Sequence, residues 1–178
     1  IIFGLKVMKE RGRDGYGIYD GRKVEISHDL DELSKKNPSK NIIGHCLHAI
    51  VKNVKQPIVN EGVLVINCEI YNWKELASKY DITAENDADL VLRLLDKKGI
   101  SIIEEFDGTF AFAYQKGSKV ILARDLIGVK PMWISRKGES FAFASEKKAL
   151  EMQRFPDVEE LNPRTIIEFD IKTNKLAE

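Results

Sequence analysis

Cysteine is scarce in this chain, which has only Cys46 and Cys68 and no C-x-x-C pair. Two cysteines are too few to form the disulfide framework of a small secreted domain, so a reduced, cytoplasmic protein is expected. No apolar run approaches the roughly 20 residues that a membrane-spanning helix needs. The composition therefore argues against a disulfide-rich scaffold and against a membrane protein.

Net charge is missing as well, because 28 basic residues balance 28 acidic residues. A chain without a basic field is not expected to bind nucleic acid or an anionic membrane. The sequence contains no repeat, low-complexity tract or linker. It also lacks an initiator methionine and begins at Ile1, which indicates a processed or truncated chain.

What is present is an ordinary globular composition, with 43% apolar and 31% charged residues among 178. A chain of this length can bury about two-thirds of its unfolded surface. We therefore expect a single domain that spans residues 1–178.

Helices are predicted in five places, two of which are residues 29–36 and 145–152. Apolar residues recur with helical spacing in residues 2–8. Asn72 and Asn86 are predicted to cap two further helices, the second of which runs through Lys98 and ends at Gly99. In this second helix an apolar stripe is expected to face a core, and it consists of Leu90, Val91, Leu94 and Leu95.

Strands are predicted around these helices. Asp20-Gly21 is typical of the turn of a hairpin, here over residues 17–26. The segment 62–68 is almost wholly apolar and is expected to be a strand buried on both faces. Further strands are predicted at 42–51, 109–114, 119–123, 132–135, 140–144 and 165–171. This arrangement predicts an α+β layered fold.

One segment, residues 67–76, carries a recognisable signature and reads N-C-E-I-Y-N-W-K-E-L. It resembles the N-G-E-I-Y-N-x-x-E-L motif of class II glutamine amidotransferase domains, closest to asparagine-synthetase-like proteins. Further blocks resemble the same family in the same order: R-G-R-D-G at 11–15, G-H-C-L-H-A-I-V at 44–51, F-D-G-T-F-A-F at 106–112, A-R-D-L-I-G-V-K-P at 123–131 and F-A-S-E-K-K-A-L at 143–150.

The resemblance implies a four-layered α/β/β/α sandwich with antiparallel sheets, the N-terminal-nucleophile hydrolase fold. It also implies catalysis by a cysteine at the mature N-terminus, whose thiolate attacks the glutamine amide while the free α-amino group serves as base. The products would be glutamate and ammonia, and the ammonia would pass to a synthetase domain in the same chain or in another. ATP and Mg would bind only in that partner domain, and no cofactor is expected in this one.

The nucleophilic cysteine is expected upstream of Ile1, because neither internal cysteine has an adjacent free amine. In one alignment, residues 1–4 are the remnant of the first strand. In the other, which matches the family's spacing better, residues 2–8 form the helix before the R-G-x-D-G loop and a whole strand precedes them. In either case the chain as it stands is not expected to run the reaction.

The resemblance also assigns roles to residues inside the chain. Asn67 and Cys68 match the side chain and the backbone N–H that form the family's oxyanion hole. Asp87 matches the residue that binds the α-amino group of glutamine, and Glu69 matches another glutamine-contacting position. Structural roles compete with these, since Asn67 can be a strand-end turn residue and Asp87 a helix-start acid favoured by the helix dipole.

Two positions depart from the family pattern. Cys68 replaces glycine, so it can donate its N–H only if its backbone conformation suits a residue with a Cβ. Leu47 replaces an arginine that pairs with the substrate carboxylate. On a regular strand the neighbouring His48 points to the opposite face. The remaining substrate-binding positions that the resemblance implies are Ile50 and Val51.

Other chemistries fit the sequence less well. The candidates for a zinc site are His45, Cys46, His48 and Cys68. Strand alternation puts the two histidines on opposite faces, so no metal site is expected. The glycines of residues 12–17 lack the Lys-Ser/Thr of a phosphate loop. The loop formed by Arg124, Asp125 and Lys130 is predicted to be structural and ion-paired, or else to contact a synthetase domain.

Two functional interpretations remain open. The first is the glutaminase half of an asparagine-synthetase-like amidotransferase, with glutamine as its ligand. The second is a catalytically degenerate binding or regulatory module of the same fold. Asn67 and Asp87 favour the first, whereas Leu47 and Cys68 favour the second. A homo-oligomer is compatible with either.

Overall fold

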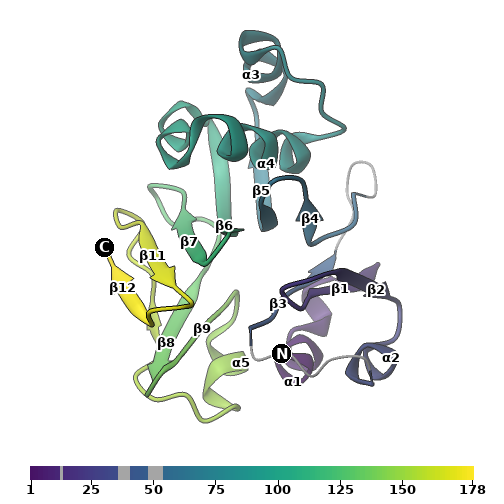
Figure 1. Ribbon diagram of the computed structural model, residues 1–178, viewed down its shortest axis with the longest axis vertical. Helices are drawn as coiled ribbons and strands as arrows, with labels where there is room; N and C mark the ends of the chain where they lie inside the picture. Colours follow the sequence, from purple (N-terminus) through teal and green to yellow (C-terminus); the bar gives the residue numbers. More distant parts are fainter. Residues whose placement is uncertain (13, 36–40, 48–53) are drawn as a thin grey trace.

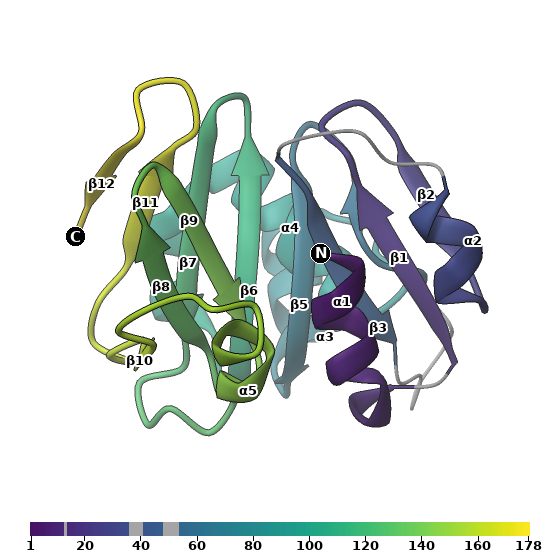
Figure 2. The same ribbon diagram turned by 90° about the horizontal axis from the view of Figure 1, so that it is seen from below.

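The computed structural model describes residues 1–12, 14–35, 41–47 and 54–178 and arranges them in four layers (Figures 1 and 2). One outer layer contains α1 (Ile2–Val7), α2 (Leu30–Ser34) and α5 (Lys147–Glu151). The other contains α3 (Trp73–Tyr80), α4 (Asp87–Lys98) and the 3-10 helix η2 (Ile100–Glu105). Antiparallel sheets fill the two inner layers, which confirms the predicted α/β/β/α sandwich.

The inner layer under α1, α2 and α5 consists of two three-stranded sheets. The first has the order β2-β1-β3 and the second the order β10-β8-β9. Their strands are β1 (Gly15–Tyr19), β2 (Val24–Ser27), β3 (Ile43–Leu47), β8 (Trp133–Lys137), β9 (Ser140–Ala144) and β10 (Glu159–Glu160). In the described residues, β3 and β9 each end their sheet, because β3 pairs only with β1 and β9 only with β8.

The other inner layer is a six-stranded sheet with the order β12-β11-β7-β6-β5-β4. Its strands are β4 (Ile58–Val59), β5 (Val63–Ile70), β6 (Gly108–Lys116), β7 (Lys119–Arg124), β11 (Ile167–Asp170) and β12 (Lys175–Ala177). β5 pairs with β6 along its whole length, from Val63 opposite Gln115 to Ile70 opposite Gly108. β4 covers only the first two residues of the opposite edge of β5, Val63 and Leu64.

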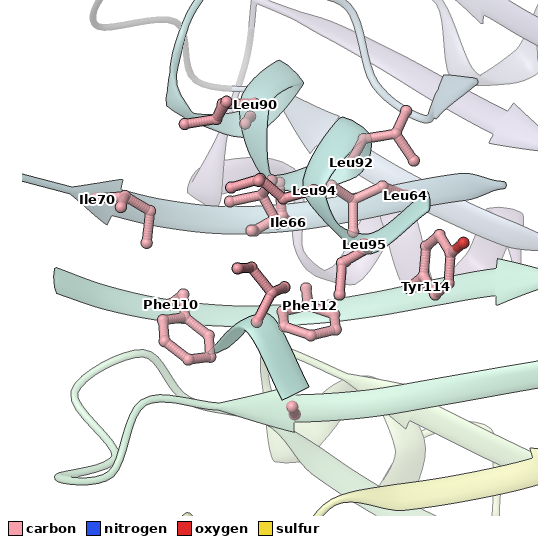
Figure 3. Close-up of a cluster of buried hydrophobic side chains, with 14 of the residues drawn as sticks. Leu64, Ile66, Ile70, Leu90, Leu92, Leu94, Leu95, Phe110, Phe112 and Tyr114 are labelled. Carbon is pink, nitrogen blue, oxygen red and sulfur yellow. The ribbon is translucent and has the colours of Figure 1, made fainter. Parts of the chain in front are cut away.

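The largest core lies between this sheet and α4 (Figure 3). Leu64 and Ile66 of β5 and Phe112 of β6 face the helix, because alternate residues of a strand point to the same side. The predicted stripe on α4 packs against them, and its four members are all buried. Val65 points to the other face of β5 and enters a second core between the two inner layers. The strand is thus buried on both faces, as predicted.

The ends of α4 agree with the sequence, and α3 starts directly after Asn72 as predicted, but without the expected side-chain cap. The Asn86 side chain accepts a hydrogen bond from the N–H of Asp89, and Gly99 ends the helix with a φ of 77°. Asn72 precedes α3, but its side chain makes no capping bond. It donates instead to Glu105 O and accepts from Asp107 N–H, which ties α3 to the loop before β6. The predicted cap at Asn72 is therefore wrong in mechanism.

The remaining differences concern short elements. The predicted helix at 2–8, the hairpin at 17–26 and the paired strands after residue 108 are present. The last predicted strand is shorter, at Ile167–Asp170. β4, β10, β12 and the 3-10 helix η1 (Lys9–Arg11) were not predicted, since two or three residues carry no periodic signal, and the six-residue η2 was not predicted either. No helix in the described part of the chain is long and apolar enough to cross a membrane.

The core between α4 and the six-stranded sheet is expected to dominate stability. Leu94 is 0% exposed and Ile127 is 85% exposed. We expect Leu94→Ala to lower the free energy of unfolding by about 2–5 kcal/mol, because it removes buried methyl groups and leaves a cavity. Ile127→Ala serves as the control and is expected to change it by less than about 0.5 kcal/mol. Urea unfolding of both variants measures this, and equal effects would contradict the assignment of the core.

Candidate functional site

A cavity of about 490 Å³ opens where the ends of β3 and β5 meet the start of α4, and we call it the site cavity. Five of the residues predicted for a glutamine site line it: Leu47, Asn67, Cys68, Glu69 and Asp87. Two others, Ile50 and Val51, lie outside the described residues, as does His48. The cavity also takes in Arg11, Lys130 and Ser145, which come from distant parts of the chain.

The edge of β5 that faces the cavity is held by side chains instead of a strand. Ile66 N–H donates to Gln56 Oε1 at 2.7 Å, and Ile66 O accepts from Gln56 Nε2 at 2.9 Å. Ile70 N–H donates to Asp87 Oδ2 at 3.1 Å. In an antiparallel strand every second N–H points to the same edge. The N–H of Cys68, between these two residues, therefore points away from β6 and toward the cavity.

The backbone of Cys68 adopts an ordinary strand conformation. Cys68 lies within β5 and pairs in register with Phe110, and it is not among the residues with positive φ. A residue with a Cβ therefore fits this position, and the replacement of glycine does not displace the N–H. The side chain of Asn67 points to the opposite face of β5 from that of Cys68, and Asn67 is also one of the residues that line the cavity.

The Cys68 side chain lies against Asp87. Its Sγ donates to Asp87 Oδ2 over 3.5 Å. Burial, followed by the negative charge of Asp87, raises the pKa of the Cys68 thiol well above its ordinary value. Burial and Glu146 raise the pKa of Cys46 to about 12. Both cysteines are therefore protonated thiols at neutral pH, and neither is a nucleophile.

Asp87 and Glu69 differ in how their charges are balanced. Glu69 Oε1 forms an ion pair with Lys130 Nζ at 2.8 Å. Asp87 accepts from Ile70 N–H, from Ala88 N–H at 2.9 Å and from Cys68, all of them neutral donors. Within the described part of the chain, no cation lies at ion-pair distance from Asp87. Asp87 is thus the carboxylate in the cavity that can bind a ligand cation, while the predicted role of Glu69 stays a prediction.

Arg11 lies beside Leu47, the position at which the resemblance implies an arginine. It ends the 3-10 helix η1 (Lys9–Arg11), and in the described residues it forms an ion pair with Glu146, at 3.9 Å. Gly12 follows, and a Cβ on it would lie 2.4 Å from Leu47 C and O. Only glycine permits this approach, which brings Arg11 to the wall of the cavity near Leu47.

His45 and Gln56 line the site cavity, although the sequence analysis assigned neither of them a role in a glutamine site. His45 Nε2 lies 3.2 Å from Ile66 O, which only accepts, so Nε2 carries the proton and Nδ1 is left with a lone pair. Nδ1 is buried and has no partner among the described residues. Burial lowers the pKa of His45 to about 4, opposed by the Ile66 hydrogen bond and aided by the charge of Arg11.

A second hollow, of about 370 Å³, adjoins the site cavity, and we call it the groove. β3 and β9 form its two sides and β5 and β6 its floor, and its cover consists of Ile1 and Met8, which flank α1, and of Leu150 of α5. Figure 2 shows β3 and β9 on the same side of the six-stranded sheet. The groove and the site cavity share Met8, Gly44, His45, Ile66, Asn67 and Ser145 in their walls. The groove therefore leads from the free edges of β3 and β9 to the site.

The loop after β7 is held rigidly, as a structural role predicts. The Arg124 guanidinium donates to Glu160, to Leu161 O and to Gly128 O. The Asp125 carboxylate accepts three hydrogen bonds from backbone N–H groups, those of Phe110, Val129 and Lys130.

In the described residues no group of three or more His, Cys, Asp and Glu side chains is placed to hold a metal ion.

Comparison with known proteins identifies the family. The family model of the glutamine amidotransferase domain matches residues 3–174. A putative glutamine-hydrolysing asparagine synthetase of Methanocaldococcus jannaschii is 36% identical over 159 residues, which are 82% of this chain and 29% of that protein. Asparagine synthetase B of Escherichia coli is 28% identical over 156 residues, 82% of this chain and 25% of that protein.

A solved structure shows the same fold. Glutamine phosphoribosylpyrophosphate amidotransferase of B. subtilis superimposes with a TM-score of 0.82 at 20% identity, over 99% of this chain and 45% of that one. The chain thus spans less than a third of the two asparagine synthetases and less than half of this enzyme.

The low pKa of His45 predicts a pH dependence of stability. The unfolded chain protonates His45 near its ordinary pKa of 6.5, whereas the folded chain does so only near 4. Between these values the unfolded state binds more protons, so stability falls as the pH falls. We expect the free energy of unfolding to drop by about 1–2 kcal/mol from pH 7 to pH 5. Urea unfolding of the wild type and of His45→Gln at both values tests this, with the drop absent in the variant.

The same prediction can be checked without a variant. The NMR signals of the His45 ring are expected to keep the chemical shifts of neutral imidazole down to about pH 5, one unit above the pKa. A titration midpoint near 6.5 would contradict the buried, neutral histidine.

Proposed function

Since the chain belongs to the glutamine amidotransferase domain family, we propose that it hydrolyses glutamine to glutamate and ammonia once a cysteine precedes Ile1. One observation carries this proposal. Cys68 and Asn67 both line one cavity, toward which the N–H of Cys68 points, and the cavity also contains Asp87, a carboxylate without a cationic partner in the described residues. These groups suit an amide that passes through a tetrahedral oxyanion while its ammonium is held nearby.

The nucleophile is the group that the described residues do not supply. We assign it to a cysteine at the start of an extended segment that lies in the groove and leads into Ile1. The groove supports this, because it offers the free edges of two strands and opens into the site cavity beside Asn67. The chain from Ile1 to Arg11 runs from the groove toward the site cavity, because Ile1 lines the groove, Met8 lines both hollows and Arg11 lines the site cavity. A segment that starts at the site and runs along the groove would reach Ile1 at its far end.

The reaction follows from these positions. The free α-amino group of the cysteine takes the thiol proton, and the thiolate attacks the amide carbon. The oxyanion accepts from Cys68 N–H and from the Asn67 amide, and such a donor contributes about 2.7–4 kcal/mol to lowering the barrier. The amine returns a proton to the leaving nitrogen, so ammonia departs and a thioester remains. Water then attacks the thioester, which releases glutamate and the free thiol.

Glutamine offers two charged groups to the cavity. Its ammonium would face Asp87, whose Oδ2 already accepts from the Cys68 thiol. Leu47 cannot bind the carboxylate, and Lys130 is already paired with Glu69 at 2.8 Å. Arg11, whose ion pair with Glu146 is longer, is therefore the cation that we assign to the substrate carboxylate.

The ammonia would pass to a synthetase domain in the same chain or another, where ATP and Mg would bind. The relatives support this, because they are named asparagine synthetases and the chain matches less than a third of their length. The rigid loop after β7 presents apolar side chains to the solvent, with Leu126 78% exposed, and such a tip suits contact with a second domain.

A second candidate function is a binding module of the same fold without glutaminase activity. Two features favour this function. Leu47 cannot pair with a carboxylate, and the thiol of Cys68 donates to Asp87 Oδ2. Such a module would bind glutamine or a related amide and would release no glutamate.

Glutamate release by the full-length protein, with its native N-terminus, separates the two functions. We expect release that is abolished by Cys→Ala at the mature N-terminus, and about 100–1,000-fold slower in Asn67→Ala because one oxyanion donor is lost. Asn60→Ala is the control, since Asn60 bonds to Asp96 and Gly62 and is not among the described residues that line the cavity. Glutamine binding without glutamate release would favour the binding module, and release without the cysteine would rule out the proposed mechanism.

A further inference from the structure

We propose that the Cys68 side chain sets the ligand specificity of the site cavity: its thiol occupies the Asp87 oxygen that a ligand ammonium would bind. The cavity then discriminates little between an ω-amide that carries an α-ammonium group and one that lacks it. This inference rests on the proposed function, because it concerns the same cavity and the same class of ligand.

In the described residues the Asp87 carboxylate accepts three hydrogen bonds. A carboxylate offers about four lone-pair positions. Two backbone groups take one on each oxygen, Ala88 N–H on Oδ1 and Ile70 N–H on Oδ2. The Cys68 thiol takes a second position on Oδ2. The backbone donors are fixed by α4 and β5, so the thiol is the donor at Asp87 that can be displaced.

The Cys68 thiol lies beside the Asp87 carboxylate oxygen Oδ2, and both residues line the cavity. Cys68 points from β5 toward the start of α4, on the same face as Ile66 and Ile70. Its Sγ is 3.5 Å from Asp87 Oδ2, so it fills the space in which an ammonium nitrogen bound to Oδ2 would lie. The thiol remains protonated there and does not bring a negative charge that would attract an ammonium. A ligand must therefore displace the thiol before its ammonium can bind Asp87 Oδ2.

The backbone of Cys68 is independent of this effect. Its N–H lies on the edge of β5 and keeps its direction whichever side chain is present, because the pairing with β6 is regular. Removing the thiol therefore frees Asp87 and leaves the oxyanion donor in place. This separates the specificity role of Cys68 from its proposed backbone role.

The test compares two ligands on the full-length protein with its nucleophilic cysteine replaced by Ala, so that neither ligand is consumed. Glutamine and glutaramate (5-amino-5-oxopentanoate) differ by the α-amino group alone, and calorimetry gives the dissociation constant of each. In the presence of Cys68 we expect the two constants to agree within about threefold. In Cys68→Ala we expect glutamine to bind about tenfold tighter than glutaramate, the gain of a charge-assisted hydrogen bond.

Two controls make the result specific. Cys46 lines the same cavity, but its Sγ donates to Leu5 O at 3.6 Å, so Cys46→Ala is expected to leave the ratio unchanged. Asp87→Asn added to Cys68→Ala is expected to abolish the new preference for glutamine. Urea unfolding of every variant identifies any that is not folded, and Cys68→Ser then serves as a second variant that shortens the donor.

The outcomes distinguish this inference from the proposed function. A strong preference for glutamine with Cys68 present, or an unchanged ratio in Cys68→Ala, overturns the role of Cys68 and leaves the glutamine site standing. Failure of both ligands to bind any folded variant overturns the proposed function and this inference together. A preference that appears only when the thiol is removed, and that requires Asp87, confirms the inference.

Discussion

The architecture of the site depends on the edge of β5 beyond Leu64, which no strand covers in the described part of the chain. β4 pairs with β5 only as far as Leu64, and beyond it the N–H groups on this edge need other partners. Gln56 satisfies Ile66 and Asp87 satisfies Ile70, with side chains in place of a strand. Because buried backbone groups are rarely left unpaired, these contacts fix where the edge stands open. It stands open at Cys68, and there the cavity begins.

The same edge organises the rest of the cavity. The Ile66 carbonyl accepts from both Gln56 and His45, which fixes the histidine tautomer and leaves a buried lone pair on Nδ1. A buried acceptor without a partner is costly, and here it lies in the wall shared by the groove and the site cavity. The position suits a donor that enters through the groove, such as the extended segment that the proposed mechanism requires.

The charged side chains in the cavity differ in how fully they are paired. Lys130 neutralises Glu69, and Arg11 is only loosely paired with Glu146. Asp87 has neutral donors alone among the described residues. An ammonium at Asp87 and a carboxylate at Arg11 would complete this balance, which is what an amino acid offers. The family membership and the open cavity favour a glutamine site, while Leu47 and the Cys68 thiol mark where this member has diverged.

The sequence by itself determined the elements that repeat a pattern and the blocks that repeat a family. The stripe on α4, its cap at Asn86 and its end at Gly99 depend on neighbours three or four residues away, so they could be read directly. The two-sided burial of β5 followed from its unbroken apolar run. Five predicted site residues also came together, because the blocks that carry them fix their place in the fold.

Only the tertiary structure decided how those side chains are used. Asn72 bonds to the loop before β6 instead of capping α3, because its partners lie more than thirty residues away. The pairing of Glu69 with Lys130, the contact of Cys68 with Asp87 and the hold of Gln56 on Ile66 likewise join distant segments. A sequence pattern records which residues are available. Competition among hydrogen-bond and ion-pair partners across the fold decides which of them remain free to bind a ligand.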